Sequence, residues 1–273
     1  MPELPEVETI CRGLRPHLAG RRIIEVQVLE RRLRHLVDER LAERLQWQKI
    51  TAVCRRSKYI LIYLQKGLIW VLHLGMSGKL IHVDAGTPNQ KHDHIIVNLD
   101  SGRQLRYHDP RRFGLSLLAT EQELETLPQF NRLGLDPFDG KFDEVYLYSF
   151  TRKSARRIRD LLLDQQVVAG IGNIYANEIL KRVGVRPTAR SFRLTREKTR
   201  QLAATTRTVL EEAIRWCGTS FSDYRDADDK FGEFQNHLRV YDREGEKCRD
   251  CPGVIKRVAL GNRGAFYCPR CQR

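Results

Sequence analysis

Two pairs of cysteines near the end of the sequence constrain its fold more than any other feature. Cys248 and Cys251 are separated by two residues, as are Cys268 and Cys271, and sixteen residues lie between the pairs. This spacing is typical of two tight turns that present four thiolates to one zinc ion. Protein ligands would fill all four positions, so the pattern predicts a structural zinc. Two disulfides are the alternative, but no secretion signal opens the sequence.

The charge of the chain points to a polyanionic partner. Its 273 residues contain 48 Lys and Arg against 34 Asp and Glu, a formal net charge of +14. Because the excess is spread along a globular sequence, nucleic acid is the leading candidate. No run of 18 apolar residues is present, so we expect no membrane span and a soluble protein.

The first 120 residues read as short strands with few helices between them. Turn signals such as Asp100-Ser101-Gly102 separate the apolar runs, which predicts an antiparallel β-sandwich or barrel. A charged stretch at 33–45 has helical spacing and is expected on the surface. The predicted strands cover residues 23–29, 50–55, 59–64, 68–74, 95–99, 104–107 and 115–118.

The pattern becomes helical after residue 120, so the fold class is α+β. Four domain assignments follow: a β-sandwich at 1–130, a linker at 131–142, a helical DNA-binding domain with a helix-two-turn-helix at 143–237 and a zinc ribbon with a β-hairpin at 238–273. Helices are expected at residues 122–127, 143–149, 155–163, 173–182 and 195–216.

The N-terminus carries a possible nucleophile. Removal of Met1 would leave Pro2 as a secondary amine, which can attack a sugar or carbonyl carbon to give an iminium. Glu3 stands beside that nitrogen. Pro5 and Glu6 suit the first turn of a helix whose apolar stripe would bury it. The same residues also satisfy ordinary helix-start chemistry without any catalysis, and this alternative stays open.

Several loops could contact a nucleic acid. Gly170-Ile171-Gly172-Asn173 between two helices could bring backbone amides close to a phosphate. Met76 and Phe113, in two glycine-bounded turns, could be wedges between bases, or could fold back into the core. His92 and His94 alternate at strand spacing, so a backbone contact or plain surface is preferred over a metal site. Lys58 alone would be a solvated lysine at a strand edge.

Taken together, these motifs resemble the formamidopyrimidine-DNA glycosylases, which excise 8-oxoguanine and act as AP lyases. The resemblance spans the whole chain. It is carried by Pro2-Glu3-Leu4-Pro5-Glu6, Arg56-Ser57-Lys58-Tyr59, His73-Leu74-Gly75-Met76-Ser77-Gly78, Asp109-Pro110-Arg111-Arg112-Phe113-Gly114, Gly170-Ile171-Gly172-Asn173 and the four cysteines.

The resemblance implies a mechanism and a partner. Pro2 would attack C1′ of a flipped nucleotide, Glu3 would act as general acid, Glu6 would position the site, and Lys58 and Arg263 would assist the two eliminations. The implied partner is double-stranded DNA with oxidised purines or abasic sites, bound by a monomer in the bacterial cytoplasm and nucleoid. The implied DNA-binding residues are Met76, His92, Arg111, Lys153, Asn173 and Phe113.

Two other functions stay open from the sequence. The endonuclease VIII type shares the N-terminal amine and the finger, although Leu4 and Arg111-Arg112-Phe113 favour the purine-lesion enzyme. A zinc-ribbon protein that binds damaged DNA without cutting it would fit the charge and the finger. Asp228-Asp229-Lys230 departs from the family pattern in the loop expected to cover the flipped base, which puts lesion preference in doubt.

Overall fold

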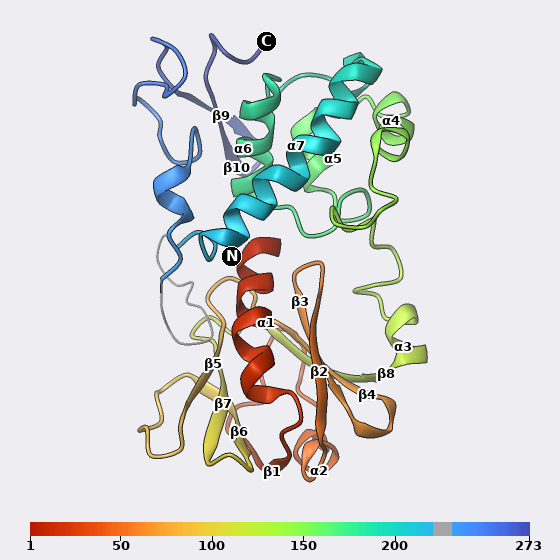
Figure 1. Ribbon diagram of the computed structural model, residues 1–273, viewed down its shortest axis with the longest axis vertical. Helices are drawn as coiled ribbons and strands as arrows, with labels where there is room; N and C mark the ends of the chain where they lie inside the picture. The colour runs from red at the N-terminus through yellow and green to blue at the C-terminus, as the bar shows by residue number, and fades with distance from the viewer. Residues whose placement is uncertain (221–230) are drawn as a thin grey trace. The chain divides into compact units, whose positions relative to one another are not determined.

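The computed structural model describes residues 1–220 and 231–273 (Figure 1). The Asp228-Asp229-Lys230 departure lies outside the described residues. The chain divides into two compact units, and each is described by itself. They comprise Met1–Asn131 with Ile214–Gln235, and Arg132–Ala213 with Asn236–Arg273. Of the described residues, 214–220 and 231–235 thus group with the N-terminal residues.

The N-terminal unit contains two four-stranded antiparallel sheets, with strand orders β1-β6-β7-β5 and β2-β3-β4-β8. The antiparallel β-rich fold predicted from the sequence is therefore confirmed, within an α+β chain. The strands are β1 Ile23–Val28, β2 Ile50–Arg56, β3 Tyr59–Leu64, β4 Leu68–His73, β5 Lys79–Asp84, β6 Asp93–Leu99, β7 Arg103–His108 and β8 Leu115–Thr120.

Helix α1 (Leu4–Leu18) supplies much of the core of this unit. Its buried side chains recur at three- and four-residue steps, and they join the apolar residues of both sheets in one cluster. Burial of a Leu or Ile side chain of this kind contributes about 2 kcal/mol. The helix predicted from the apolar stripe is confirmed, and its fully buried members are Val7, Ile10, Cys11, Leu14 and Leu18.

Two expectations for this unit are wrong. Only Leu41–Leu45 (α2) of the stretch 33–45 is helical. Val37 instead closes a turn, because its backbone exchanges hydrogen bonds with Arg31: the Val37 N–H donates to the Arg31 carbonyl and Arg31 Nε donates to the Val37 carbonyl. Strand β5 was not expected, since Lys79, His82 and Asp84 interrupt its apolar pattern.

The remaining elements are mainly helices, close to the bounds expected from the sequence. The exceptions are the end of α4, which lies at Arg152 rather than Ser149, and the start of α5, which lies at Ile158 rather than Ala155. The elements are α3 Glu121–Thr126, α4 Glu144–Arg152, α5 Ile158–Leu163, α6 Asn173–Val183, α7 Arg196–Arg215, the antiparallel pair β9 Lys256–Leu260 and β10 Arg263–Tyr267, and the short 3-10 helices Gln65–Gly67, Ser191–Arg193 and Phe234–His237.

A buried carboxylate ties α6 to the segment that leads into the cysteine region. Glu178 has no exposed surface, and its oxygens accept hydrogen bonds from the backbone N–H groups of Arg239, Val240 and Tyr241, each at 2.9 Å. Burial raises the pKa of Glu178, while the three donors act in the opposite direction. The side chain thus orders backbone that belongs to no helix or sheet.

We expect Glu178→Gln to lower the free energy of unfolding by about 1–3 kcal/mol, because an amide nitrogen would face a backbone donor in a buried site. Thermal unfolding followed by circular dichroism measures the change. Glu197→Gln, at an exposed position paired with Arg200, is the matched control and should leave the transition almost unchanged. Equal shifts for the two variants would contradict this role of Glu178.

Candidate functional site

The two oxygens of the Glu6 carboxylate hold the start of α1. Oε2 accepts the Glu3 N–H at 2.8 Å and Oε1 accepts the Thr219 N–H at 2.8 Å. Glu3 and Glu6 form a capping box at the helix N-terminus, and both are almost fully buried. Gly218 has φ +77°, and a Cβ there would lie 2.8 Å from Glu6 Oε1. The buried Pro2 therefore precedes a rigid turn.

Lys58 lies in the turn between β2 and β3, where Ser57 adopts a positive φ of 55°. Its side chain is almost fully buried rather than solvated, so the solvated strand-edge alternative is wrong. Arg55 attaches this turn to α1, since its Nη1 donates to the Ser57 carbonyl and its Nε to Glu8, both at 3.1 Å. The turn that carries Lys58 is thus fixed to the helix that begins beside Pro2 and Glu3.

Asp109 joins the two loops that were expected to contact bases. Its carboxylate accepts hydrogen bonds from Ser77 Oγ and from the Gly114 N–H, both at 2.8 Å, and its side chain is fully buried. Its carbonyl oxygen lies 2.7 Å from His94 Nε2. His94 is therefore a buried support of this loop, and the alternative that placed it on the plain surface is wrong.

The side chains carried by these loops are exposed. Met76 is 41% exposed and Phe113 is 46% exposed, so the alternative in which they fold back into the core is wrong. The Arg111 guanidinium lies over the Phe113 ring, with Cζ 4.9 Å from the ring centroid. Two apolar side chains and an arginine are thus held out from a loop pair whose backbone is fixed by buried hydrogen bonds.

His73 sets the backbone at the start of the first loop, where its Nδ1 accepts the Gly75 N–H at 2.9 Å. Gly75 is required there because it has φ +59° and a Cβ would lie 2.5 Å from the Phe113 carbonyl carbon. Burial, with the nearby charges of Lys58 and Arg34, lowers the pKa of His73 to about 4. The imidazole is thus a neutral acceptor at physiological pH.

His92 belongs to a hollow of mixed charge in the same unit. A cavity of about 410 Å³ is lined by His92, Lys91 and Arg112, and also by the carboxylates Glu30 and Asp93. Partial burial and the nearby His108 and Lys91 hold the pKa of His92 below its usual value. The phosphate contact of His92 stays a prediction.

In the C-terminal unit, Asn173 is the first residue of α6 and binds the β9–β10 hairpin. Its Nδ2 donates to the Gly264 carbonyl at 3.1 Å, and its Oδ1 accepts from Arg159 Nη2 at 2.6 Å. Asn177, one turn further, accepts the Phe266 N–H at 2.8 Å. The Asn173 side chain is therefore engaged within this unit, which leaves the phosphate role to the backbone amides at the start of the helix.

Two of the predicted site residues of this unit are exposed cations. Lys153 ends α4 and Arg263 begins β10. Arg159 is fully buried beneath the hairpin, and burial lowers its pKa, with a further contribution from Arg263. No role was predicted from the sequence for Arg159, Asn177 or Glu178. These charged and amide residues interrupt apolar helical patterns, and that interruption could have indicated that they are buried and hydrogen-bonded.

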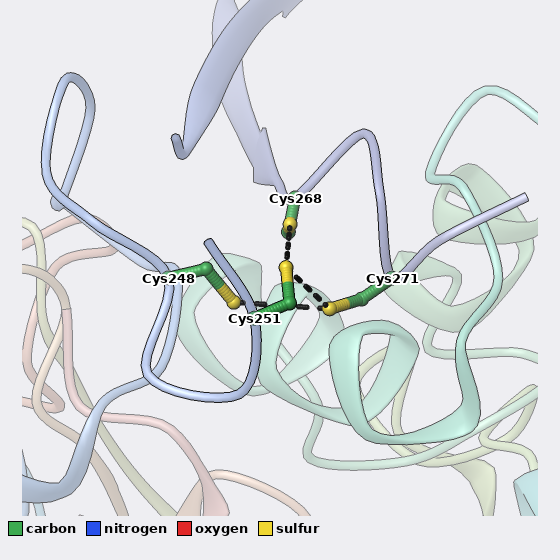
Figure 2. Close-up of side chains that lie close together, drawn as sticks. All are labelled: Cys248, Cys251, Cys268 and Cys271. Carbon is green, nitrogen blue, oxygen red and sulfur yellow. Dashed lines mark hydrogen bonds between the residues drawn. The ribbon is translucent and has the colours of Figure 1, made fainter. Parts of the chain in front are cut away.

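The four predicted cysteines meet at one point (Figure 2). Their sulfur atoms lie within 4.8 Å of one another, with Sγ–Sγ distances of 3.5 Å for Cys251–Cys268 and 3.8 Å for Cys248–Cys271. Four thiolates at 2.3 Å from a tetrahedral zinc ion lie about 3.8 Å apart. The cluster therefore fits one structural zinc ion. Lys181, whose Nζ lies 2.7 Å from Asp250, brings a positive charge to this thiolate-rich site.

Comparison with known proteins gives the family. Three family models match: the formamidopyrimidine-DNA glycosylase N-terminal domain over residues 1–116, the formamidopyrimidine-DNA glycosylase H2TH domain over 133–225, and a zinc finger found in FPG and IleRS over 245–273. The chain belongs to the formamidopyrimidine-DNA glycosylase family. Formamidopyrimidine-DNA glycosylases of Thioalkalivibrio sulfidiphilus and Pseudomonas putida are 48% and 42% identical to it, each over 100% of both chains.

Solved structures of this glycosylase family agree. A mutant Lactococcus lactis FPG in complex with a Fapy-dG containing DNA has a TM-score of 0.92 and 33% identity, over 100% of both chains. A Lactococcus lactis Fpg in complex with DNA containing an abasic site has a TM-score of 0.91 and 32% identity, over 99% of both. The family predicted from the motifs is confirmed, as are the α+β fold and the single structural zinc. No helix in the described part of the chain is long and apolar enough to cross a membrane.

For this glycosylase family member we expect Asp109→Asn to weaken binding to a lesion-containing duplex by about tenfold, because a loop that is less ordered before binding must be ordered on binding. Fluorescence anisotropy measures the dissociation constant. Asp84→Asn, an exposed carboxylate on β5 of the same unit, is the control and should bind like the unsubstituted protein. Normal binding by Asp109→Asn would contradict the role assigned to Asp109.

The low pKa of His73 predicts a loss of stability in acid. The unfolded chain takes up a proton on His73 near pH 6.5 but the folded protein only near pH 4, so the contribution is complete above pH 6.5 and decreases by up to about 3 kcal/mol as the pH falls to 4. Calorimetry at pH 7 and at pH 4.5 measures the change in stability. Between these two pH values, the His73→Asn variant should lose less free energy of unfolding than the unsubstituted protein. The exposed His35→Asn control should lose as much as the unsubstituted protein, and parallel losses for all three would refute the assignment.

We expect Cys248→Ser to lose the bound zinc and to bind duplex DNA at least tenfold more weakly, since zinc binding and folding of the finger are coupled. Metal analysis and anisotropy provide the two measurements. Cys54→Ser, outside the cluster, should keep one equivalent of zinc and normal affinity. Unchanged duplex binding by metal-free Cys248→Ser would show that the finger does not contribute to DNA binding.

Proposed function

We propose that this protein is a bifunctional DNA glycosylase and AP lyase that removes 8-oxoguanine and formamidopyrimidines from duplex DNA in base excision repair. Family membership over the whole chain supports the activity class. The observation that carries the residue assignment is the capping box at α1, where buried Glu3 and Glu6 fix the backbone next to Pro2. The protein acts as a monomer in the bacterial cytoplasm, where its +14 charge favours association with the nucleoid.

The first chemical steps use Pro2 and Glu3. With Met1 removed, the Pro2 nitrogen lone pair forms a bond to C1′ of the flipped nucleotide. The bond from C1′ to the damaged base breaks, and the base leaves with the bonding electron pair and takes up the proton that the Pro2 nitrogen releases. Glu3 donates a proton to the sugar ring oxygen as the ring opens, which leaves an iminium between Pro2 and C1′. Glu6 does not touch the substrate; it positions Glu3 through the Glu3 N–H.

Strand cleavage follows from the iminium. The positive nitrogen makes the C2′ proton acidic, so its loss expels the 3′ phosphate, and a second elimination expels the 5′ phosphate. Lys58 supplies a proton in the first elimination. Arg263 assists the second as an electrostatic clamp on the departing phosphate, because a guanidinium stays protonated. The zinc ion held by the four cysteines gives the hairpin its fold and takes no part in these steps.

The remaining predicted residues bind the duplex. Met76 and Phe113 fill the space left by the flipped nucleotide, and Arg111 faces the orphaned cytosine. Their exposure above a backbone fixed by Asp109 supports this role. Phosphate contacts are assigned to His92, Lys153, Arg263 and the backbone amides at Asn173.

Borohydride trapping tests the proposal. An 8-oxoguanine duplex mixed with processed protein and borohydride should give a covalent complex, because reduction makes the iminium bond permanent. Absence of a complex would favour a protein that binds damaged DNA without cutting it. Trapping with pyrimidine lesions alone would favour the endonuclease VIII type.

Glu3→Gln separates the two activities. We expect base excision to slow by about 100-fold or more, because the general acid is lost, while trapping on a preformed abasic site persists. Single-turnover kinetics measure both steps. Glu25→Gln, an exposed carboxylate on β1, is the control, and equal loss of excision in the two variants would contradict the assignment of Glu3.

A further inference from the structure

The C-terminal unit contains a basic hollow that no part of the proposed reaction uses. This cavity, of about 840 Å³, lies at the C-terminal end of α6, and its lining includes Arg186, Arg190, Arg193 and Lys198. Asn173, at the other end of α6, contacts the hairpin near Arg263. Because an 11-residue helix is about 16 Å long, the two regions are at opposite ends of this element.

The four cations of this basic hollow are not paired with Asp or Glu side chains in the described part of the chain. No Asp or Glu lines the hollow, and within the described residues none of the four side chains forms a salt bridge. Their internal hydrogen bonds go to neutral acceptors: Arg186 donates to the Gln272 carbonyl, Arg190 to the Ala155 carbonyl, and Lys198 to the Val183 carbonyl. The groups are thus positioned by the fold while retaining donors for an anion.

Two further features narrow the ligand class. The first turn of α7 adds backbone N–H groups, with Thr195 capping the helix through a hydrogen bond from the Lys198 N–H to its Oγ1. Val185, Ala189 and Leu194 give the same hollow an apolar part. A ligand that fits both parts carries several negative charges close together and a flat apolar body.

We propose that this hollow binds a nucleoside di- or triphosphate. Arginine forks suit the phosphate oxygens, the helix start suits the terminal phosphate, and the apolar part suits the base. The volume lies in the range of sites for ligands of this size. A peptide carboxylate would bring one charge per residue, which is a lower charge density than a polyphosphate chain provides.

Titration calorimetry on the zinc-loaded protein, saturated with lesion duplex to occupy the repair site, tests the proposal. ATP and ADP should each bind at one site, more tightly than inorganic phosphate. The double variant Arg190→Gln/Arg193→Gln should bind ATP at least tenfold more weakly. The control is Arg200→Gln. Arg200 lies on α7 with Lys198, but it is outside the hollow and pairs with Glu197, so this variant should bind ATP normally.

Three results would overturn the proposal. One is no saturable binding of ATP or ADP by the duplex-bound protein. A second is equal ATP affinity in the double variant, measured after circular dichroism and zinc content show that it is folded. The third is a double variant that binds a second, undamaged duplex more weakly but binds ATP with unchanged affinity. That result would make a DNA backbone the occupant of the hollow. Lesion cleavage by the double variant should stay normal, so failure here and failure of the repair activity are distinguishable.

Discussion

The start of α1, with Pro2 and Glu3, depends on one carboxylate, that of Glu6. Its two oxygens accept backbone N–H groups from Glu3 and Thr219, which are more than 200 residues apart in the sequence. A buried carboxylate with both oxygens satisfied fixes the positions of its donors, because leaving either donor unpaired would cost about 1–3 kcal/mol. The geometry of Pro2 and Glu3 therefore follows from the packing of α1 as a whole.

The same physical device recurs at the other sites. Asp109 fixes two loops through Ser77 and Gly114, and Glu178 fixes the backbone before the first cysteine pair. In each case a buried acid accepts hydrogen bonds from backbone or hydroxyl donors. Beside Asp109, Met76 and Phe113 stay exposed. Buried acids thus order the backbone at all three places.

Much of the fold could be predicted because the signals were local. The apolar stripe of α1, the short strands and the cysteine spacing each depend on nearby residues only. The stretch at 33–45 misled the prediction because Leu33, Val37, Leu41 and Leu45 are four residues apart and all buried, although a turn at Arg31–Val37 places the first two. The spacing of apolar residues indicates which of them are buried. It does not identify the element, because a turn can bury the same residues as a helix.

The residues of the candidate site could be predicted from the sequence, but the residues that hold them in place could not. Pro2, Glu3 and Lys58 were recognised through motifs. The contributions of Arg55, Asp109 and Arg159 depend on contacts with Glu8, Ser77 and Gly264 in distant segments, which no local pattern encodes. For Asn173, the position in the fold was predicted but the contacts of the side chain were not. Its place at a helix start was foreseen, yet its side chain binds Gly264 and Arg159 rather than pointing at a ligand.

The central claim is that the nitrogen of Pro2 is the nucleophile, which requires removal of Met1. Intact-mass measurement of the protein recovered from the covalent DNA complex, beside the unreacted protein, tests it most directly. The account predicts that every cross-linked chain lacks the mass of methionine and that the DNA remnant maps to Pro2. Cross-linked protein that still carries Met1, or a remnant on a lysine, would contradict it.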